Sequence, residues 1–102
     1  MDRASLKQLA ELFWVLSHPT RLEMLRRLSR APTQWSVLIH GLGCSRQAAA
    51  RHIKILQSAG LISAGDHPEW YIYHLTGAPL AALHAWLERY CRLSAKIADD
   101  LR

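Results

Sequence analysis

The sequence predicts a mainly α-helical domain with one small β-hairpin, in the order of four helices, two strands and a last helix. Apolar residues recur at steps of three and four through most of the chain, as on one side of an amphipathic helix. The run Trp-Tyr-Ile-Tyr-His-Leu at 70–75 has the aromatic and β-branched composition of a strand. Proline and glycine separate the segments, so a single domain over residues 1–102 is expected.

The first two helices are predicted at 4–16 and 19–30. Pro19 suits the first turn of the second helix. The apolar stripe of the first helix consists of Leu6, Leu9, Phe13 and Leu16. In the second helix, the residues expected to face inward are Leu22, Leu25 and Leu28.

A short third helix at about 34–40 and a longer fourth helix follow. The short helix should bury some of its apolar residues, Trp35, Val37, Leu38 and Ile39. Gly41-Leu42-Gly43 is a tight turn, Ser45 is a good N-cap for the fourth helix, and Gly60 ends it. A short helix, a glycine turn and a longer helix indicate a helix-turn-helix over residues 33–60.

Two strands at 61–64 and 70–75 then form a hairpin over residues 61–76, which would be the wing of a winged helix-turn-helix. The last helix runs from near Pro79 towards Leu101 with a heptad-like apolar seam. One small core cannot easily absorb the stripes of both terminal segments, so we expect 1–17 and 78–102 to form a homodimer. The expected interface residues are Leu6, Leu9, Phe13, Leu16, Leu83, Leu87, Tyr90 and Ile97.

The net charge of +5 is concentrated in the middle of the chain. Seven basic residues and only Glu23 as an acid lie between Thr20 and Gly60, whereas the rest of the chain holds six basic and seven acidic residues. A local excess of this kind indicates a face that binds a polyanion, although a solvated surface is the alternative.

The fourth helix is the predicted reader of double-stranded DNA. Ala49, Ile53 and Leu56 repeat at helical spacing and can seat it on the core, which leaves a basic and amide face outward. Arg and Gln read base edges in the major groove, Lys and Arg hold phosphates, and alanines permit close approach. The predicted DNA-binding residues are Arg21, Ser45, Arg46, Gln47, Ala50, Arg51, His52 and Lys54.

Two of these predictions have alternatives. Arg21 either donates to phosphate or pairs with Glu23 or a helix terminus. His52 either contacts phosphate or packs beside the core.

The stretches "LSHPTRLEMLRRL", "GCSRQAAARHIKILQSAGLI" and "WYIYHL" resemble the ArsR family of winged-helix bacterial repressors, over about 12–90. The resemblance implies a homodimer built from the first and last helices. The tail "GAPLAALHAWLERY" resembles a branch without an inducer metal site, often described as autorepressors. The chain departs from the family in an acidic wing tip, with Asp66 and Glu69, and in Ala48 and Ala50, where hydroxyl residues are common.

The resemblance places a thiolate pair of metal-sensing members near 35–39, where this chain has no cysteine. His84, Glu88 and Cys91 share one face of the last helix and could hold zinc. We expect instead that the first two lie at a rim and that Cys91 packs in the dimer seam. Cys44 could pair with Cys91 as a redox sensor, but it is expected to pack in the turn as a small apolar residue. No metal or cofactor is predicted.

Other function classes find less support in the sequence. It holds no nucleophile–base–acid set, phosphate loop or evident carboxylate pair, so no enzyme is expected. No apolar run is long enough for a membrane span, and the N-terminus lacks the order of a signal peptide, so a cytoplasmic location is expected. The leading hypothesis is a homodimeric repressor on a palindromic operator, with its effector, if any, unknown. The alternatives are a metal- or thiol-responsive repressor and a winged-helix module that binds protein rather than DNA.

Overall fold

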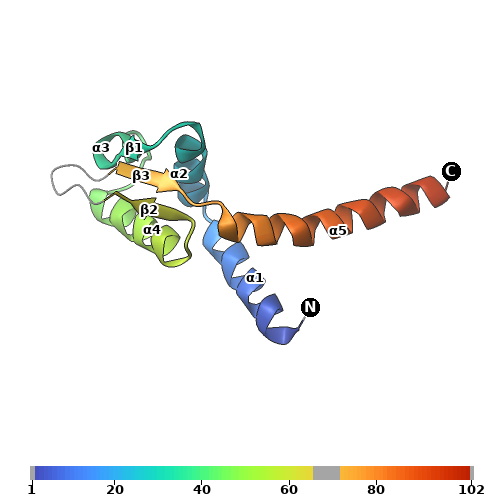
Figure 1. Ribbon diagram of the computed structural model, residues 1–102. Coiled ribbons are helices and arrows are strands. Elements are labelled where there is room, and N and C mark those ends of the chain that lie inside the picture. The colour runs from blue at the N-terminus through green and yellow to red at the C-terminus, as the bar shows by residue number, and fades with distance from the viewer. Residues whose placement is uncertain (1, 66–71, 102) are drawn as a thin grey trace.

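The computed structural model describes residues 2–65 and 72–101 and shows a compact head from which the last helix projects (Figure 1). The prediction of a mainly helical winged helix-turn-helix is confirmed. The elements in order are α1 (Arg3–Leu16), α2 (Pro19–Arg30), β1 (Thr33–Gln34), α3 (Trp35–Leu38), α4 (Arg46–Ser58), β2 (Ile62–Ala64), β3 (Ile72–Leu75) and α5 (Ala78–Asp100).

The core lies where α1, α2, α3 and α4 meet the sheet. Ala49, Ile53 and Leu56 of α4 are buried in it, as predicted. The remaining members of this cluster are Leu12, Val15, Met24, Leu28, Leu38, Leu61, Ile62 and Tyr73. The core therefore fixes α4 by one side only and leaves its other side to solvent.

The inward face of α2 differs from the predicted leucine stripe. Leu22 is 50% exposed, whereas Met24 is fully buried. The buried positions of this helix are Arg21, Met24 and Leu28, which follow steps of three and four like a leucine stripe but include an arginine. The inward face thus includes Leu25, which packs against the core, and Leu28, as predicted, but it includes Arg21 and Met24 in place of Leu22.

The sheet contains a third strand that the predicted hairpin lacked. Its order is β1-β3-β2, and both pairings are antiparallel. Thr33 of β1 lies opposite Tyr73, and Ala64 of β2 lies opposite the same residue from the other side. The wing is thereby joined to the segment that precedes α3. The predicted tip of the wing, including Asp66 and Glu69, lies outside the described residues.

Both ends of α4 have the predicted caps. The Ser45 side chain accepts a hydrogen bond from the Ala48 N–H at 3.0 Å. At the other end, Gly60 has a φ of 75°, and the Leu61 N–H donates to the Leu56 carbonyl at 3.0 Å. This left-handed turn is one that glycine adopts without steric cost, so the helix ends there and the chain enters β2.

The last helix, α5, buries none of its 23 residues. It extends well beyond the head (Figure 1), and the molecule measures 57 × 29 × 22 Å. The radius of gyration is 16.7 Å, against about 13 Å for a compact domain of this length. The part of the helix beyond Tyr90, whose residues are all exposed, therefore gains little stability from contacts within its own protomer.

Candidate nucleic-acid interface

The exposed side of α4 carries the residues predicted to read DNA. Arg46, Gln47, Ala50, Arg51 and Lys54 are all exposed. The buried residues of the same helix point the other way into the core, as its amphipathic spacing requires. A surface of basic and amide side chains therefore lies on a helix that is capped at both ends.

The basic residues of α2 are less free than those of α4. Glu23 accepts hydrogen bonds from Arg26 at 2.7 Å and from Arg27 at 3.1 Å. These two guanidinium groups lower the pKa of the Glu23 carboxyl to about 2. Within residues 2–65 and 72–101, by contrast, Arg51 and Lys54 take part in no ion pair. Two basic residues of α2 thus share the charge of Glu23, whereas the basic residues of α4 form no ion pair among the described residues.

Arg27 has a positioning role that the sequence did not reveal. Its Nη1 donates to the carbonyls of Leu38 at 2.9 Å and of His40 at 2.6 Å. These carbonyls end α3 and open the turn that leads to α4, in which Gly41 and Gly43 have φ values of 69° and 75°. The side chain therefore ties α2 to the helix-turn-helix corner.

Arg21 is directed into the protein rather than outward. It is 5% exposed, and its Nε donates to the Val15 carbonyl at the C-terminal end of α1. Its guanidinium also lies 5.2 Å from the centre of the Trp14 ring. The expectation of a phosphate contact is corrected, since the helix-terminus alternative describes this residue.

His52 packs beside the core, which was its alternative interpretation. Its ring centre lies 4.3 Å from that of His18, and its Nδ1 lies 3.2 Å from Arg21 Nη1. Burial lowers the pKa of His52, and the nearby charges of His18, Arg21 and Arg51 lower it further. A neutral ring can accept the Arg21 hydrogen bond at Nδ1, so this residue connects α4 to Arg21 on α2.

Comparison with known proteins agrees with this arrangement. A family model described as a helix-turn-helix domain matches residues 16–63. The HTH-type transcriptional regulator YgaV of Escherichia coli (strain K12) is 32% identical over 91 residues, which cover 87% of this chain and 92% of that protein. The HTH-type transcriptional regulator Rv2034 of Mycobacterium tuberculosis is 32% identical over 75 residues, covering 74% of this chain and 70% of that protein.

Solved structures extend the match to both terminal helices. An ArsR-like transcriptional regulator from Rhodococcus sp. RHA1 is 33% identical with a TM-score of 0.75, covering 96% of this chain and 92% of that chain. A crystal structure of an ArsR family transcriptional regulator has a TM-score of 0.78 at 29% identity, covering 87% of this chain and 92% of that chain. The chain belongs to the ArsR family. It is accordingly a DNA-binding transcriptional regulator of the helix-turn-helix type, in a family of proteins that are not enzymes.

In this ArsR-family chain, the apolar face left open by α1 and α5 is narrower than the predicted one. Leu9 is only 8% exposed, which corrects its assignment to the dimer interface. Leu16 and Leu83 pack against the core of the protomer. The predicted interface residues that remain exposed are Leu6, Phe13, Leu87, Tyr90 and Ile97.

Aromatic contacts hold α1 against the start of α5. Phe13 meets Trp86 edge to face with the ring centres 5.6 Å apart, and Trp86 lies 4.6 Å from Tyr90. Leu93 and Leu101 are also exposed on α5, although the predicted interface did not include them. A homodimeric winged helix-turn-helix domain from Mycobacterium bovis shares the fold, with a TM-score of 0.68 at 23% identity over 94% of this chain and 91% of that chain.

The cysteines and the zinc alternative also have a place in the structure. Cys44 is exposed, so the expectation that it packs in the turn is wrong, and Cys91 is exposed within the protomer. Glu88 pairs with Arg92, whose hydrogen bonds and charge lower the pKa of the Glu88 carboxyl. Among the residues the structure describes, His, Cys, Asp and Glu side chains form no group of three that could hold a metal ion. Across the same residues, no helix is both long and apolar enough to cross a membrane.

Proposed function

We propose that this regulator is a homodimeric repressor that binds a palindromic operator through α4. The observation that carries the proposal is the exposed face of α4, whose Arg51 and Lys54 have no ion-pair partner among the described residues. The opposite side of α4 is buried in the core of the head, which holds the helix in place. Such a helix can enter the major groove without a change in the fold of the head.

The residues of α4 have different roles in this proposal. Arg46 and Gln47 lie in the first turn, which points most directly at base edges, and each can make a bidentate contact. Arg51 lies one turn further along, within reach of a base or a phosphate, and Lys54 contacts a phosphate. Ala50 places a methyl group where a thymine methyl can meet it.

Ser45 and His52 act beside this face. The Ser45 oxygen accepts a backbone hydrogen bond as N-cap, so its hydroxyl hydrogen remains available to a phosphate. His52 supports α4 from behind, through its contact with Arg21. Arg21 itself is left out of the proposed DNA contacts because it is buried.

The dimer follows from the apolar residues of α1 and α5. A monomer would expose Leu87, Tyr90, Leu93 and Ile97 on a helix that buries nothing. A second copy seated on this surface removes it from water, which stabilises the pair. Two α4 helices then enter successive major grooves about 34–36 Å apart, and the two-fold symmetry of the protein requires a palindromic site.

Repression is the simplest action of such a dimer. Occupation of the operator then blocks transcription. The resemblance of the sequence to ArsR repressors supports the same direction of control.

The test compares Arg46→Ala, Gln47→Ala and Lys54→Ala on operator and scrambled DNA across a salt series, with the operator located by footprinting upstream of the protein's own gene. Loss of a bidentate base contact reduces discrimination by about 1–3 kcal/mol, so the first two variants should lose preference for the operator. Loss of a phosphate contact should weaken binding to both DNAs and reduce the salt slope by about 1.

Arg92→Ala is the matched control, because Arg92 is basic and exposed but lies on α5 in a pair with Glu88. It should bind both DNAs as the parent does. If the three α4 variants remain folded and dimeric and also bind operator like the parent, this face does not read DNA. The alternative of a protein-binding module would then lead.

A further inference from the structure

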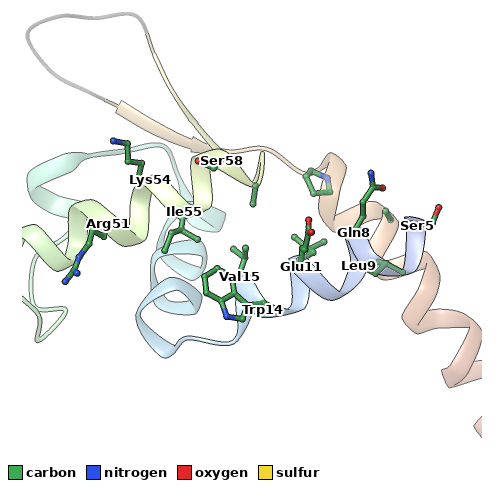
Figure 2. A pocket seen from close by; sticks show the side chains of 14 residues that line it. Ser5, Gln8, Leu9, Glu11, Trp14, Val15, Arg51, Lys54, Ile55 and Ser58 are labelled. Atoms are coloured by element: carbon green, nitrogen blue, oxygen red, sulfur yellow. The ribbon is translucent and has the colours of Figure 1, made fainter. Parts of the chain in front are cut away.

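A groove lies between α1, α4 and the start of α5 (Figure 2). Its volume is about 1060 Å³, and the apolar side chains that line it include Leu12, Trp14, Val15 and Ile55. Trp14 is 61% exposed, although it is one of the largest apolar side chains of the head. An open apolar surface of this size on the head indicates a site that another chain covers.

One apolar stripe of α5 lines the groove at the beginning of the helix and is uncovered at its end. Pro79 and Ala82 form the α5 wall of the groove. At about 100° per residue, Leu93 lies about 20° and Ile97 about 60° around the helix from Ala82, so they share its side. Both are about half exposed, and Leu101, at about 100° from Ala82, is 81% exposed. The stripe therefore continues from the groove to the far end of the helix.

The far end of α5 cannot fill the groove of its own protomer. The helix is continuous from Ala78 to Asp100, and Figure 1 shows its C-terminal end far from α4. The accessible surface of the chain is 7413 Å², against about 5,800 Å² for a folded monomer of 11.6 kDa. The excess is larger than the roughly 800 Å² that each partner contributes to a standard interface. The uncovered surface is therefore sufficient for a second copy to bind both the groove and the end of α5.

Two copies of α5 can cover each other's stripes in an antiparallel pair. A two-fold dimer is self-complementary, so each chain gives and receives the same contact. Because the stripe runs from Pro79 to Leu101, the pairing that covers all of it has its two-fold axis near the midpoint, Tyr90. This register places Leu101 of the partner subunit level with Pro79, and Ile97 of the partner subunit one turn further along. The end of α4 lies beside the same level, since a Cβ added to Gly60 would be 3.6 Å from Pro79 Cγ.

We propose that the groove receives the last turns of α5 from a second copy of this chain, with Leu101 of the partner subunit against Ile55 and Ser58 of α4. This contact deepens the proposed function and rests on its dimer. Because Ile55 and Ser58 belong to the helix assigned to DNA, each protomer supports the reading helix of the other. Assembly and the position of the DNA-binding face are then coupled by a contact that neither chain makes alone.

The first experiment measures the dimer dissociation constant of Ser58→Trp by sedimentation. Ser58 lines the groove and is exposed in the protomer, so a tryptophan there occupies the groove without entering the core. The dissociation constant should rise about tenfold or more, because the unfavourable contact occurs twice in each dimer. Gln57→Trp is the matched control, since Gln57 is exposed on the same turn of α4 but does not line the groove. It should dimerise as the parent does.

A second variant supplies the complementary change at the end of α5. Leu101→Ala removes apolar area from the contact and should raise the dissociation constant about tenfold. Ser58→Trp combined with Leu101→Ala in one chain should recover part of the loss, because the smaller side chain makes room for the indole in the groove of the partner. Residues in contact show such non-additive effects, whereas distant ones do not. Additive losses would contradict the contact.

The last experiment joins two chains covalently, in a background where Cys44→Ser and Cys91→Ser remove the two exposed cysteines. Chains with Ser58→Cys are mixed with chains that have Leu101→Cys, and the mixture is oxidised with diamide. A disulfide should link one chain of each kind. Asp99→Cys in place of Leu101→Cys is the control and should give little product, because Asp99 lies about 160° around the helix from Leu101.

The outcomes distinguish this contact from the proposed function. A parent that dimerises but gives no cross-link, or whose dimer is unchanged in Ser58→Trp, overturns the contact and leaves the groove to another occupant, while the dimer and its operator binding stand. A parent that sediments as a monomer overturns both the dimer and the contact. If the cross-link forms but the parent binds no DNA, the proposed function fails and the contact stands.

Discussion

The head and α5 both contain many apolar residues but use them differently. In the head, buried residues from α1 to β3 form one cluster that includes fully buried Met24 and Leu38. In α5 no residue is buried, and Tyr90, Leu93 and Ile97 are each about half exposed. The head thus has its stabilising contacts within one chain, whereas α5 exposes an apolar surface that the proposed dimer would cover.

The difference implies that substitutions in the two regions act on different equilibria. A change in the head alters the free energy of unfolding of the protomer. In the proposed dimer, a change on the seam of α5 should alter association, and should change DNA binding through the loss of two-site attachment. The following predictions test this division, from the largest effect to the smallest.

The largest effect is expected from a double substitution on the α5 seam. Leu87→Glu with Ile97→Glu places four carboxylates in a symmetric apolar interface, so sedimentation should show a monomer. Operator affinity should fall by about 10²–10⁴, because each half-site must then be bound independently. Arg89→Glu with Lys96→Glu is the control, since it adds the same carboxylates to exposed positions of the same helix. A dimer that persists in the first variant would contradict the proposed seam.

A smaller effect, confined to the head, is expected for Arg21→Met. Methionine retains the buried stem but cannot donate to the Val15 carbonyl, so unfolding in urea should require less denaturant. The loss should be about 2–3 kcal/mol, the usual contribution of hydrogen bonds from a charged group. Arg26→Met, on the exposed side of the same helix, should change stability much less. Equal losses in the two variants would show that burial of Arg21 does not matter.

The pH dependence of stability should reflect His52. Because burial lowers its pKa in the folded protein, the unfolded chain binds more protons as the pH falls below about 6.5. The free energy of unfolding should therefore be highest above that pH and decrease as the pH falls through the folded pKa. His52→Gln, which keeps a hydrogen-bond acceptor for Arg21, should flatten this part of the profile, whereas His84→Gln on α5 should not. A parent curve that matches His52→Gln would contradict the assignment.

The smallest effect is expected on the polar side of α5. Glu88 and Arg92 form an exposed pair one helical turn apart, a class that often contributes nothing measurable to stability. Glu88→Gln should leave the thermal unfolding midpoint, the dimer and operator binding as they are. A requirement for Glu88 in zinc retention after dialysis would revive the metal-site alternative and contradict this prediction.

The sequence correctly predicted the elements that have long repeated patterns, but it did not predict features that depend on a single tertiary contact. The positions of α1, α2, α4 and α5 follow from repeated apolar spacing together with Pro19, Ser45 and Gly60. The strand at 33–34 has two residues, too few for any periodic signal, and it pairs only because β3 presents a free edge. Its existence depends on a tertiary contact rather than on local composition.

The candidate site shows the same limit. The outward face of α4 could be predicted because three buried positions of that helix determine which side is free. The role of Arg21 could not, since an arginine is rarely buried and its acceptors are backbone carbonyls of another helix. Leu9 was misassigned for a related reason: periodicity identifies an apolar face but not whether its partner lies in the same chain or in a second one.

The link from Arg21 to both α1 and His52 has a consequence for the angle at which α4 meets DNA. If the dimer is held through α1 and α5, each reading helix lies at the end of an arm of about 17 Å, half the distance between grooves. A rotation of the head by about 10° about the two-fold axis of such a dimer would displace α4 by about 3 Å, close to the rise of one base pair. If the proposed dimer forms, the contacts of Arg21 with Val15 and His52 should help to limit its tolerance for operators with one base pair more or fewer between half-sites.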